Sequence, residues 1–263
     1  MYIDNSVMYQ IMYEVPDDRI LECLKIRNQM CGSNGVGDGK KLVISDGKKI
    51  SRYLLESLRG DVVFSGGIEH KGVVFSRTER SEWNNGLNNK INKERIFNFI
   101  YTVFGVNCDD KRRGYPSAGG NYPVNIIFIC RSEEMDNYWN MYHLLPTINS
   151  IEAVGNIPEE ELRKVISSSD QVDVFSSDFI VFYGVIPYLT IAKYGLRGYK
   201  FSLIEVGLAA ECGTLLAAEN NIYEKLYGYY DERGISEVLG FNENTIFIEL
   251  MHLFKFKGDA DEG

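Results

Sequence analysis

Residues 111–123 read KRRGYPSAGGNYP, the most informative segment of the chain. The segment combines two adjacent arginines, a serine hydroxyl and paired glycines with two Tyr-Pro dipeptides. Within one turn, these residues offer fixed positive charge and backbone N–H groups that a ligand can approach closely. Such a turn can hold a flat anionic cofactor, although composition alone favours a tight loop with surface arginines.

The segments on either side of this turn have clear secondary-structure patterns. Asn92 is a suitable N-cap for KERIFNFIYTVF at 93–104, an apolar helix that ends at Gly105. The runs 124–130 and 179–186 are apolar throughout, as expected of central strands that are covered on both faces. Weaker patterns predict a strand at 141–145 ended by Pro146, a helix opened by Pro158, a helix at 235–239 and a strand at 245–254.

The longest predicted helix spans 199–219. It has few charges and many small residues, which indicates a mostly buried helix. Small residues allow another backbone or a flat ligand to approach closely, and helix-on-helix packing explains them equally well. The charges are Lys200, Glu205, Glu211 and Glu219, and the small residues are Gly207, Ala209, Ala210, Gly213, Ala217 and Ala218.

The composition is typical of a soluble globular protein. The chain has 263 residues, of which 44% are hydrophobic and 25% charged, so it can form one large domain or a domain with an appended arm. We divide it into a helical N-terminal lead-in, 1–65, and a main domain, 66–263. The glycine-rich segment 31–41 lacks the spacing of a phosphate-binding loop, so we interpret it as a surface turn.

Charge and cysteine usage narrow the possible partners and location. The net charge of −9, with a pI near 5.0, argues against binding to nucleic acid or to an anionic membrane surface. No uninterrupted apolar run approaches the ~20 residues of a membrane-spanning helix, and the N-terminus lacks a signal-peptide pattern. Five cysteines without a CxxC pair fit free thiols in a reducing cytosol. We therefore expect a cytoplasmic protein.

Histidine and acidic residues give no sign of a metal site or of an acid–base pair. His70, His143 and His252 share no ligand spacing, so we expect each to be structural and expect no metal. The run Glu159–Glu161 is interpreted as a solvated helix N-terminus, stabilised by the helix dipole.

The segment RRGYPSAGGNYP at 112–123 resembles the signature of a known family. This family is the SagB-type, thiazole/oxazole-forming branch of the flavin-dependent nitroreductase-like oxidoreductases. AKYGLRGYKFSLIEVG at 192–207 is similar to the family's Lys-Tyr pair and to the Arg-Gly-Tyr-Arg sequence that enters its central helix, with Lys200 replacing the second arginine. The resemblance looks closest to the dehydrogenase subunits of azole-containing microcin synthetases.

The resemblance implies an α+β, nitroreductase-like fold with a central, mostly antiparallel sheet flanked by helices. It also implies an intertwined homodimer with FMN at the interface between the two copies. The small-residue helix at 199–219 would pack across this interface. Residues implied to bind FMN are Arg112, Arg113, Tyr115, Ser117 and Gly119, with Arg77 and Arg80 for its phosphate.

The resemblance further implies FMN-dependent oxidation of thiazoline or oxazoline rings in a ribosomally made precursor peptide, in complex with a cyclodehydratase. This oxidation removes a proton from one ring carbon and a hydride from its neighbour, so a base must lie within hydrogen-bond reach. Lys193 and Tyr194 match the family's catalytic pair, although elsewhere a Lys-Tyr dipeptide is usually a surface lysine beside a packed ring. Which of the two is the base stays open.

Two other functions also remain open. One is a free-standing, NAD(P)H-dependent flavin reductase that acts on nitro compounds or quinones. The other is a flavin-binding scaffold subunit without catalytic activity. The full RRGYPSAGG motif and the Lys193–Tyr194 pair favour azoline oxidation over both.

Overall fold

The computed structural model describes Trp83 and residues 92–107, 112–169, 172–242 and 245–257. Five expectations from the sequence lie outside these residues. The helical lead-in and its boundary at residue 65 therefore stay predictions. So do the glycine-rich surface turn, the structural role of His70 and the assignment of Arg77 and Arg80 to the cofactor phosphate.

A six-stranded sheet forms the centre of the described fold. Its strand order is β3-β2-β1-β4-β6-β5, and every neighbouring pair is antiparallel. The expected sheet of mostly antiparallel strands is therefore confirmed. The strands are β1 (Val124–Arg131), β2 (Tyr138–Leu145), β3 (Ser150–Pro158), β4 (Phe179–Val185), β5 (Ile222–Tyr227) and β6 (Phe247–Phe256).

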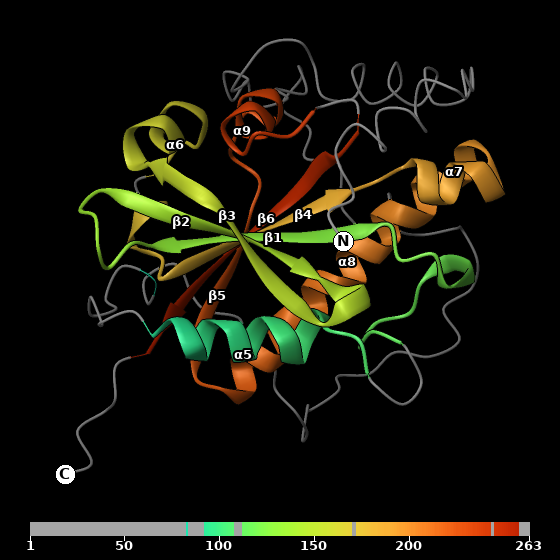
Figure 1. Ribbon diagram of the computed structural model, residues 1–263, viewed down its shortest axis with the longest axis horizontal. Helices are drawn as coiled ribbons and strands as arrows, with labels where there is room; N and C mark the ends of the chain where they lie inside the picture. The colour runs from blue at the N-terminus through green and yellow to red at the C-terminus, as the bar shows by residue number, and fades with distance from the viewer. Residues whose placement is uncertain (1–82, 84–91, 108–111, 170–171, 243–244, 258–263) are drawn as a thin grey trace, which may run out of the picture.

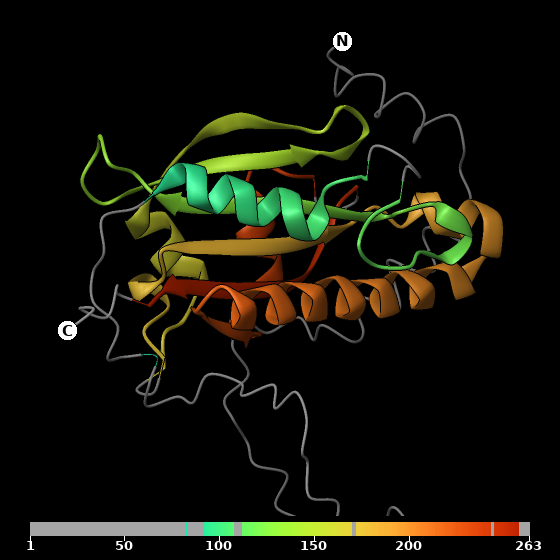
Figure 2. The same cartoon turned by 90° about the horizontal axis from the view of Figure 1, so that it is seen from below.

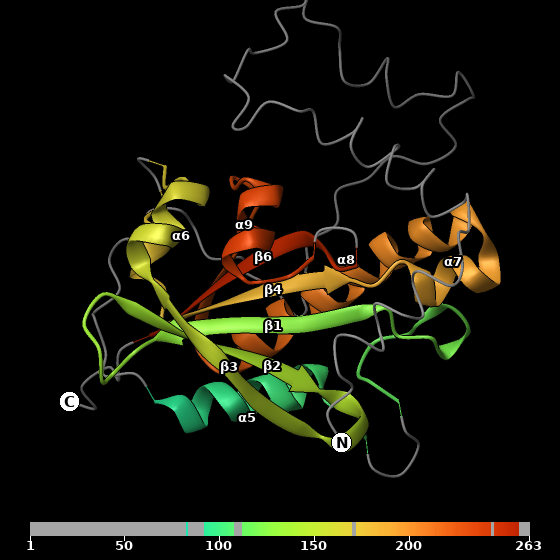
Figure 3. The same ribbon diagram turned by 45° about the horizontal axis from the view of Figure 1, so that its top comes forward.

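Helices cover both faces of this sheet. Helices α5 and α8 lie against one face, and α6 and α9 lie against the other (Figures 1 and 3). A further helix, α7, precedes α8 directly and projects beyond the end of the sheet (Figure 3). The helices are α5 (Lys93–Phe104), α6 (Glu159–Val165), α7 (Tyr188–Tyr194), α8 (Leu196–Glu219) and α9 (Glu232–Val238).

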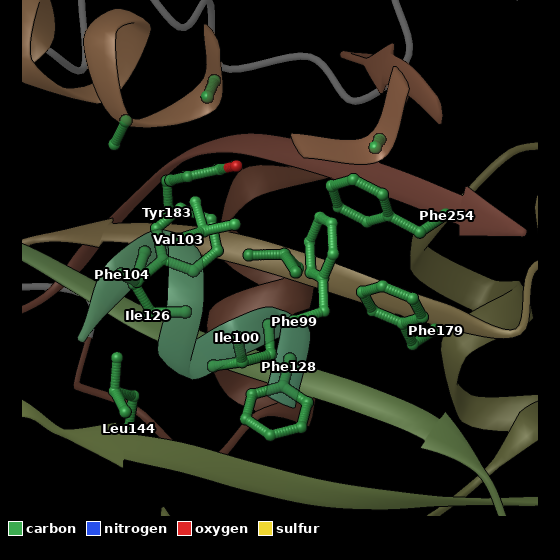
Figure 4. Close-up of a cluster of buried hydrophobic side chains, with 14 of the residues drawn as sticks. Phe99, Ile100, Val103, Phe104, Ile126, Phe128, Leu144, Phe179, Tyr183 and Phe254 are labelled. Carbon is green, nitrogen blue, oxygen red and sulfur yellow. The ribbon is translucent and has the colours of Figure 1, made fainter. Parts of the chain in front are cut away.

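Aromatic rings fill the core between the sheet and α5 (Figure 4). The rings of Phe179 and Phe254 stack with centroids 4.7 Å apart, across the β4–β6 pair. Phe99 of α5 meets both rings edge-on, at 5.0 and 5.5 Å. Such pairs contribute about 0.5–1.5 kcal/mol each beyond the area that they bury, so α5 is held firmly on the sheet.

Strand β4 is buried on both faces, as its apolar sequence predicted. Val181 and Tyr183 point into the core beneath α5 and α8, whereas Ile180 and Phe182 point into the core beneath α6 and α9. This alternation follows from the two-residue period of a strand.

Helix α8 is longer and less buried than expected. It begins at Leu196, one turn before the predicted start, because Gly195 adopts a φ of +59° and separates it from α7. Its buried residues lie on the side that faces the sheet, while Ile204 and Leu208 are 51% and 39% exposed. The expectation of a mostly buried helix was wrong for the single chain, because one sheet face covers only one side of a helix.

Helix α8 is also long and apolar enough to cross a membrane, and 44% of its apolar 18-residue segment is buried in the protein. This is weak evidence for a membrane, since the core helix of a soluble protein meets the same requirements.

Candidate functional site

Arg113 braces the loop that precedes β1 from within. Its Nη1 donates hydrogen bonds to the hydroxyl of Tyr115 and to the carbonyl oxygen of Val124, both at 2.6 Å. Its backbone N–H donates to the hydroxyl of Tyr122 at 3.2 Å, and its guanidinium lies 5.1 Å from the centre of that ring. Within this chain, Arg113 therefore ties the two ends of the loop together, and a direct contact with a cofactor stays a prediction.

Tyr115 anchors the loop in the core. Its side chain is 2% exposed and packs in the cluster beneath α5 and α8. Burial raises the pKa of Tyr115 to about 12, although the charge and the hydrogen bond of Arg113 oppose the shift. The hydroxyl therefore keeps its proton at physiological pH. Contact between Tyr115 and a cofactor is likewise untested.

The tip of the loop is a short helical turn, η1 (Ala118–Gly120). The hydroxyl of Ser117 accepts a hydrogen bond from the N–H of Tyr122 at 2.8 Å and closes this turn. Gly119 and Gly120 have φ angles of +64° and +69°, in the left-handed region that glycine adopts at little cost. Both glycines are exposed, so a ligand can reach their backbone.

This tip lies against the C-terminal end of α7. A Cβ atom at position 119 would overlap the hydroxyl of Tyr194 and would lie 2.6 Å from Nζ of Lys193. Figure 2 shows the green loop beside the orange helices α7 and α8 at one end of the sheet. The structure thus brings together the two motifs that the sequence singled out, while their roles in binding and catalysis stay predictions.

Local packing holds the Lys193–Tyr194 pair at this position. The N–H of Gly195 donates to the carbonyl oxygen of Ile191 at 2.8 Å and ends α7 directly after the pair. The ring of Tyr194 meets Phe201 edge-on at 5.4 Å, and Nζ of Lys193 lies 5.4 Å from the centre of the Tyr194 ring. Lys193 itself is exposed in the single chain.

Glu205 of α8 also lies beside the loop, and no motif in the sequence marks it for a role there. Its side chain faces the loop and is 2% exposed. Burial raises the pKa of Glu205 to about 6, and the hydroxyl of Ser117, the charge of Arg113 and the N–H of Val124 oppose this shift. None of these groups completes a hydrogen bond of normal geometry, so neither carboxylate oxygen has a full partner among the described residues.

One hollow adjoins the loop, and another lies away from it. The first, of about 470 Å³, is lined by Arg112, Arg113 and Gly114 together with the end of α5 and Asn149. The second, of about 340 Å³, lies between α5 and the C-terminal end of α8. Neither is lined by the loop tip or by the Lys193–Tyr194 pair. The exposed tip and this pair are thus a surface site in the single chain.

A set of exposed apolar residues, which we call the outer face of α8, adjoins this site and is interspersed with the exposed charged residues Arg197, Lys200 and Glu211. It consists of Leu196, Ile204, Gly207 and Leu208, and Leu189 of α7 is exposed nearby in sequence. A Cβ atom added at Gly207 would meet no neighbouring atom within 4 Å among the described residues.

The histidines behave as structural residues where the structure describes them. His143 pairs with Glu152 at 2.8 Å on the surface of the sheet. His252 is fully buried and contacts Tyr183 at 3.1 Å and Glu224 at 2.8 Å. No group of three or more potential metal ligands occurs among the described residues.

One acidic residue departs from its expected environment. Glu159 was interpreted as part of a solvated helix N-terminus, but its carboxylate accepts a hydrogen bond from the buried Trp139 indole at 3.1 Å. It also pairs with Arg163 of the same helix. Glu159 therefore fastens α6 to β2 and is only partly solvated.

Comparison with known sequences identifies a relative. The sequence matches no protein-family profile. It is 26% identical over 155 residues to the microcin B17-processing protein McbC of Escherichia coli. The match covers 57% of this chain and 56% of that protein, so the aligned stretch is little more than half of either.

Comparison with solved structures establishes the fold. A chain of the E. coli microcin synthetase McbBCD complex, solved with truncated pro-MccB17 bound, matches with a TM-score of 0.69 and 20% identity, over 96% of this chain and 98% of that chain. A protein of Ralstonia eutropha JMP134 assigned as a nitroreductase matches with a TM-score of 0.54 and 14% identity, over 74% and 89%. The chain therefore has the expected α+β, nitroreductase-like fold.

Proposed function

We propose that this chain is the flavin-dependent dehydrogenase subunit of a heterocycle synthetase, in which it oxidises thiazoline or oxazoline rings to thiazoles or oxazoles. The observation that carries the proposal is the contact of Gly119 with the Lys193–Tyr194 pair. It places two groups that can take a proton beside exposed glycines, in the fold of a chain from a microcin synthetase. The sequence similarity to McbC supports the same activity.

The described part of the site fits one side of a flat anionic cofactor. Gly119 and Gly120 allow close approach to the backbone, and the guanidinium of Arg112 adds an exposed positive charge. We propose FMN as the flavin, because the sequence has no GxGxxG turn for a dinucleotide. Ser117 would shape the turn, and Arg113 and Tyr115 would hold it in place.

Lys193 or Tyr194 would act as the base. When bound, the flavin would supply the hydride acceptor of the reaction. The side chain of Lys193 or Tyr194 would take the proton from the ring carbon next to the peptide carbonyl. Both groups are held at Gly119 by the packing described above, and a positioned base contributes about 10²- to 10⁴-fold in rate.

We also propose that the chain acts as a homodimer through the outer face of α8. Ile204 and Leu208 are exposed in the single chain although they are large and apolar, and Gly207 between them leaves room for a second backbone. Cover by a second copy would also enclose Lys193, which the single chain leaves exposed.

The proposed partners follow from the same comparison. The matched McbBCD structure is a complex with a peptide bound, so we infer that this chain acts on a ribosomally made precursor peptide beside cyclodehydratase subunits. Such a complex would operate in the cytoplasm, where the peptide is made. The net charge of −9 is consistent with protein partners and not with nucleic acid.

A free-standing flavin reductase is the second candidate, because the fold also matches a protein assigned as a nitroreductase.

Purified protein should release FMN on heating and should remove two hydrogens per ring from an azoline-bearing peptide. Oxidation of NAD(P)H with a quinone or nitro acceptor, without azoline oxidation, would favour the reductase. Bound flavin with neither activity would indicate a scaffold subunit.

A further inference from the structure

Buried polar atoms without hydrogen-bond partners are concentrated at one place in the described structure. Four such side-chain atoms occur among the described residues: Nε of Arg113, Nδ2 of Asn121 and both carboxylate oxygens of Glu205. Two of these residues belong to the 112–123 loop, and the third faces that loop from α8. Buried polar groups are normally paired, so such a cluster requires a functional or structural reason.

Glu205 is the unusual member of this cluster, because it buries a negative charge. The charged and titratable groups that influence it from the loop are Arg113 and Tyr115. The Arg113 charge, the Ser117 hydroxyl and the Val124 N–H all favour the ionised carboxylate. Burial opposes ionisation, and it is the largest of these effects. A neutral side chain of the same length would avoid this cost, but it would lose the attraction to the loop.

One of these three groups, Ser117, belongs to the half of the loop that contacts α7. Ser117 lies close to Glu205 and closes the turn by accepting a hydrogen bond from the N–H of Tyr122. Two residues later, Gly119 contacts Lys193 and Tyr194. The loop thus lies close to α8 at Ser117 and close to the end of α7 at Gly119.

We propose that Glu205 is a positioning residue, whose carboxylate holds the Ser117–Gly120 turn so that Gly119 stays packed against Lys193 and Tyr194. The proposal rests on the proposed function only for the role of this turn in flavin binding. Its effect on the loop is a property of the ligand-free protein.

The test compares wild-type protein with Glu205→Gln, which keeps the size and removes the charge, and with Glu205→Asp, which keeps the charge. Glu219→Gln is the matched control, because Glu219 is an exposed carboxylate at the far end of the same helix. Amide hydrogen exchange of the full ligand-free chain is measured over 113–122, together with the melting temperature. FMN affinity is then measured by quenching of flavin fluorescence.

In Glu205→Gln, we expect exchange over 113–122 to become roughly tenfold faster and FMN to bind roughly tenfold more weakly, the usual scale for interactions with a charged group. The melting temperature should stay equal or rise, because a buried charge is removed. Glu205→Asp should restore most of the protection, and Glu219→Gln should match wild type. A general structural defect would instead lower the melting temperature and speed exchange throughout the sheet.

Unchanged exchange over 113–122 in Glu205→Gln would overturn the proposal, as would an Asp variant that behaves like Gln. Wild-type protein that binds no flavin would contradict the proposed function instead. In that case, the exchange data would still decide the role of Glu205.

Discussion

Gly119 packs closely against the hydroxyl of Tyr194, because a Cβ atom at position 119 would overlap that hydroxyl. Any side chain at position 119 would therefore displace Tyr194. The two residues belong to separate motifs, one before the first described strand and one at the end of α7. Their contact sets the distance between the exposed turn and the groups that we propose as the base.

Gly119→Ala should therefore impair the site more than its size suggests. The backbone φ of +64° disfavours alanine by about 1 kcal/mol, and the new methyl group would also displace Tyr194 or Lys193. We expect a lower free energy of unfolding in urea and weaker FMN binding. Gly120→Ala is the control, because it has a similar φ of +69° but no neighbour within 4 Å. Equal losses of FMN affinity in both variants would show that the contact of Gly119 with Tyr194 and Lys193 does not contribute to FMN binding.

Glu205→Gln should stabilise the ligand-free protein in a pH-dependent way. Burial raises the pKa of Glu205 from 4.5 to about 6, so the folded protein retains a proton that the unfolded chain loses between these pH values. The ionised carboxylate therefore costs stability above pH 6, and this cost disappears below 4.5. At pH 7.5, urea unfolding of Glu205→Gln should show a free energy of unfolding that is higher by up to about 2 kcal/mol, since a shift of one pKa unit corresponds to about 1.4 kcal/mol. A gain that is independent of pH would show that burial of the charge is not its cause.

Gly207→Leu should separate the proposed dimer without disturbing the single chain. A Cβ atom at position 207 would meet no atom of the described residues within 4 Å, and a leucine there would stand on the outer face of α8 between Ile204 and Leu208. Sedimentation at micromolar concentration should show a wild-type dimer and a variant with a larger monomer fraction and less bound flavin. Gly155→Leu on the exposed part of β3 is the control. A wild-type monomer that is saturated with flavin would rule out the dimer proposal.

The buried His252 should titrate below its ordinary range. Burial lowers its pKa from 6.5, although Glu224 opposes the shift, so the neutral ring would accept from Tyr183 and donate to Glu224. Because the unfolded chain binds this proton more readily, stability that depends on His252 is lost as the pH falls below 6.5. The imidazole resonance of His252 in NMR should shift at a midpoint below 6.5. A midpoint above 6.5 would contradict the neutral network.

Much of the fold could be predicted from the sequence, because in most elements the capping residues and the apolar pattern agree with the burial that the structure shows. Helix α5 has the predicted bounds, since Asn92 accepts from the N–H of Arg95 and Gly105 ends the helix as expected. Strand β5 was missed because its inward-facing Glu224 is polar, and only the distant His252 explains why a carboxylate is buried there. The edge strand β3 was missed because much of it is exposed and Gly155 interrupts its apolar pattern.

The site was predicted by motif and not by periodicity. Gly119 and the Lys193–Tyr194 pair were identified from a family resemblance, and the fold brings them into contact. Glu205 could not be recognised, because a single glutamate in a helix is usually on the solvent side. Only the packing of α8 under the loop shows that this carboxylate is buried.

The most direct test of the proposed function is mass spectrometry of an azoline-bearing peptide incubated with flavin-loaded protein and its partner subunits. Wild type should remove two hydrogens per ring. Lys193→Ala and Tyr194→Phe should retain flavin and fold, and the variant that lacks the base should be slower by about 10²- to 10⁴-fold. An unchanged peptide mass with wild type would contradict azoline oxidation, and wild-type rates in both variants would contradict the assignment of the base to this pair.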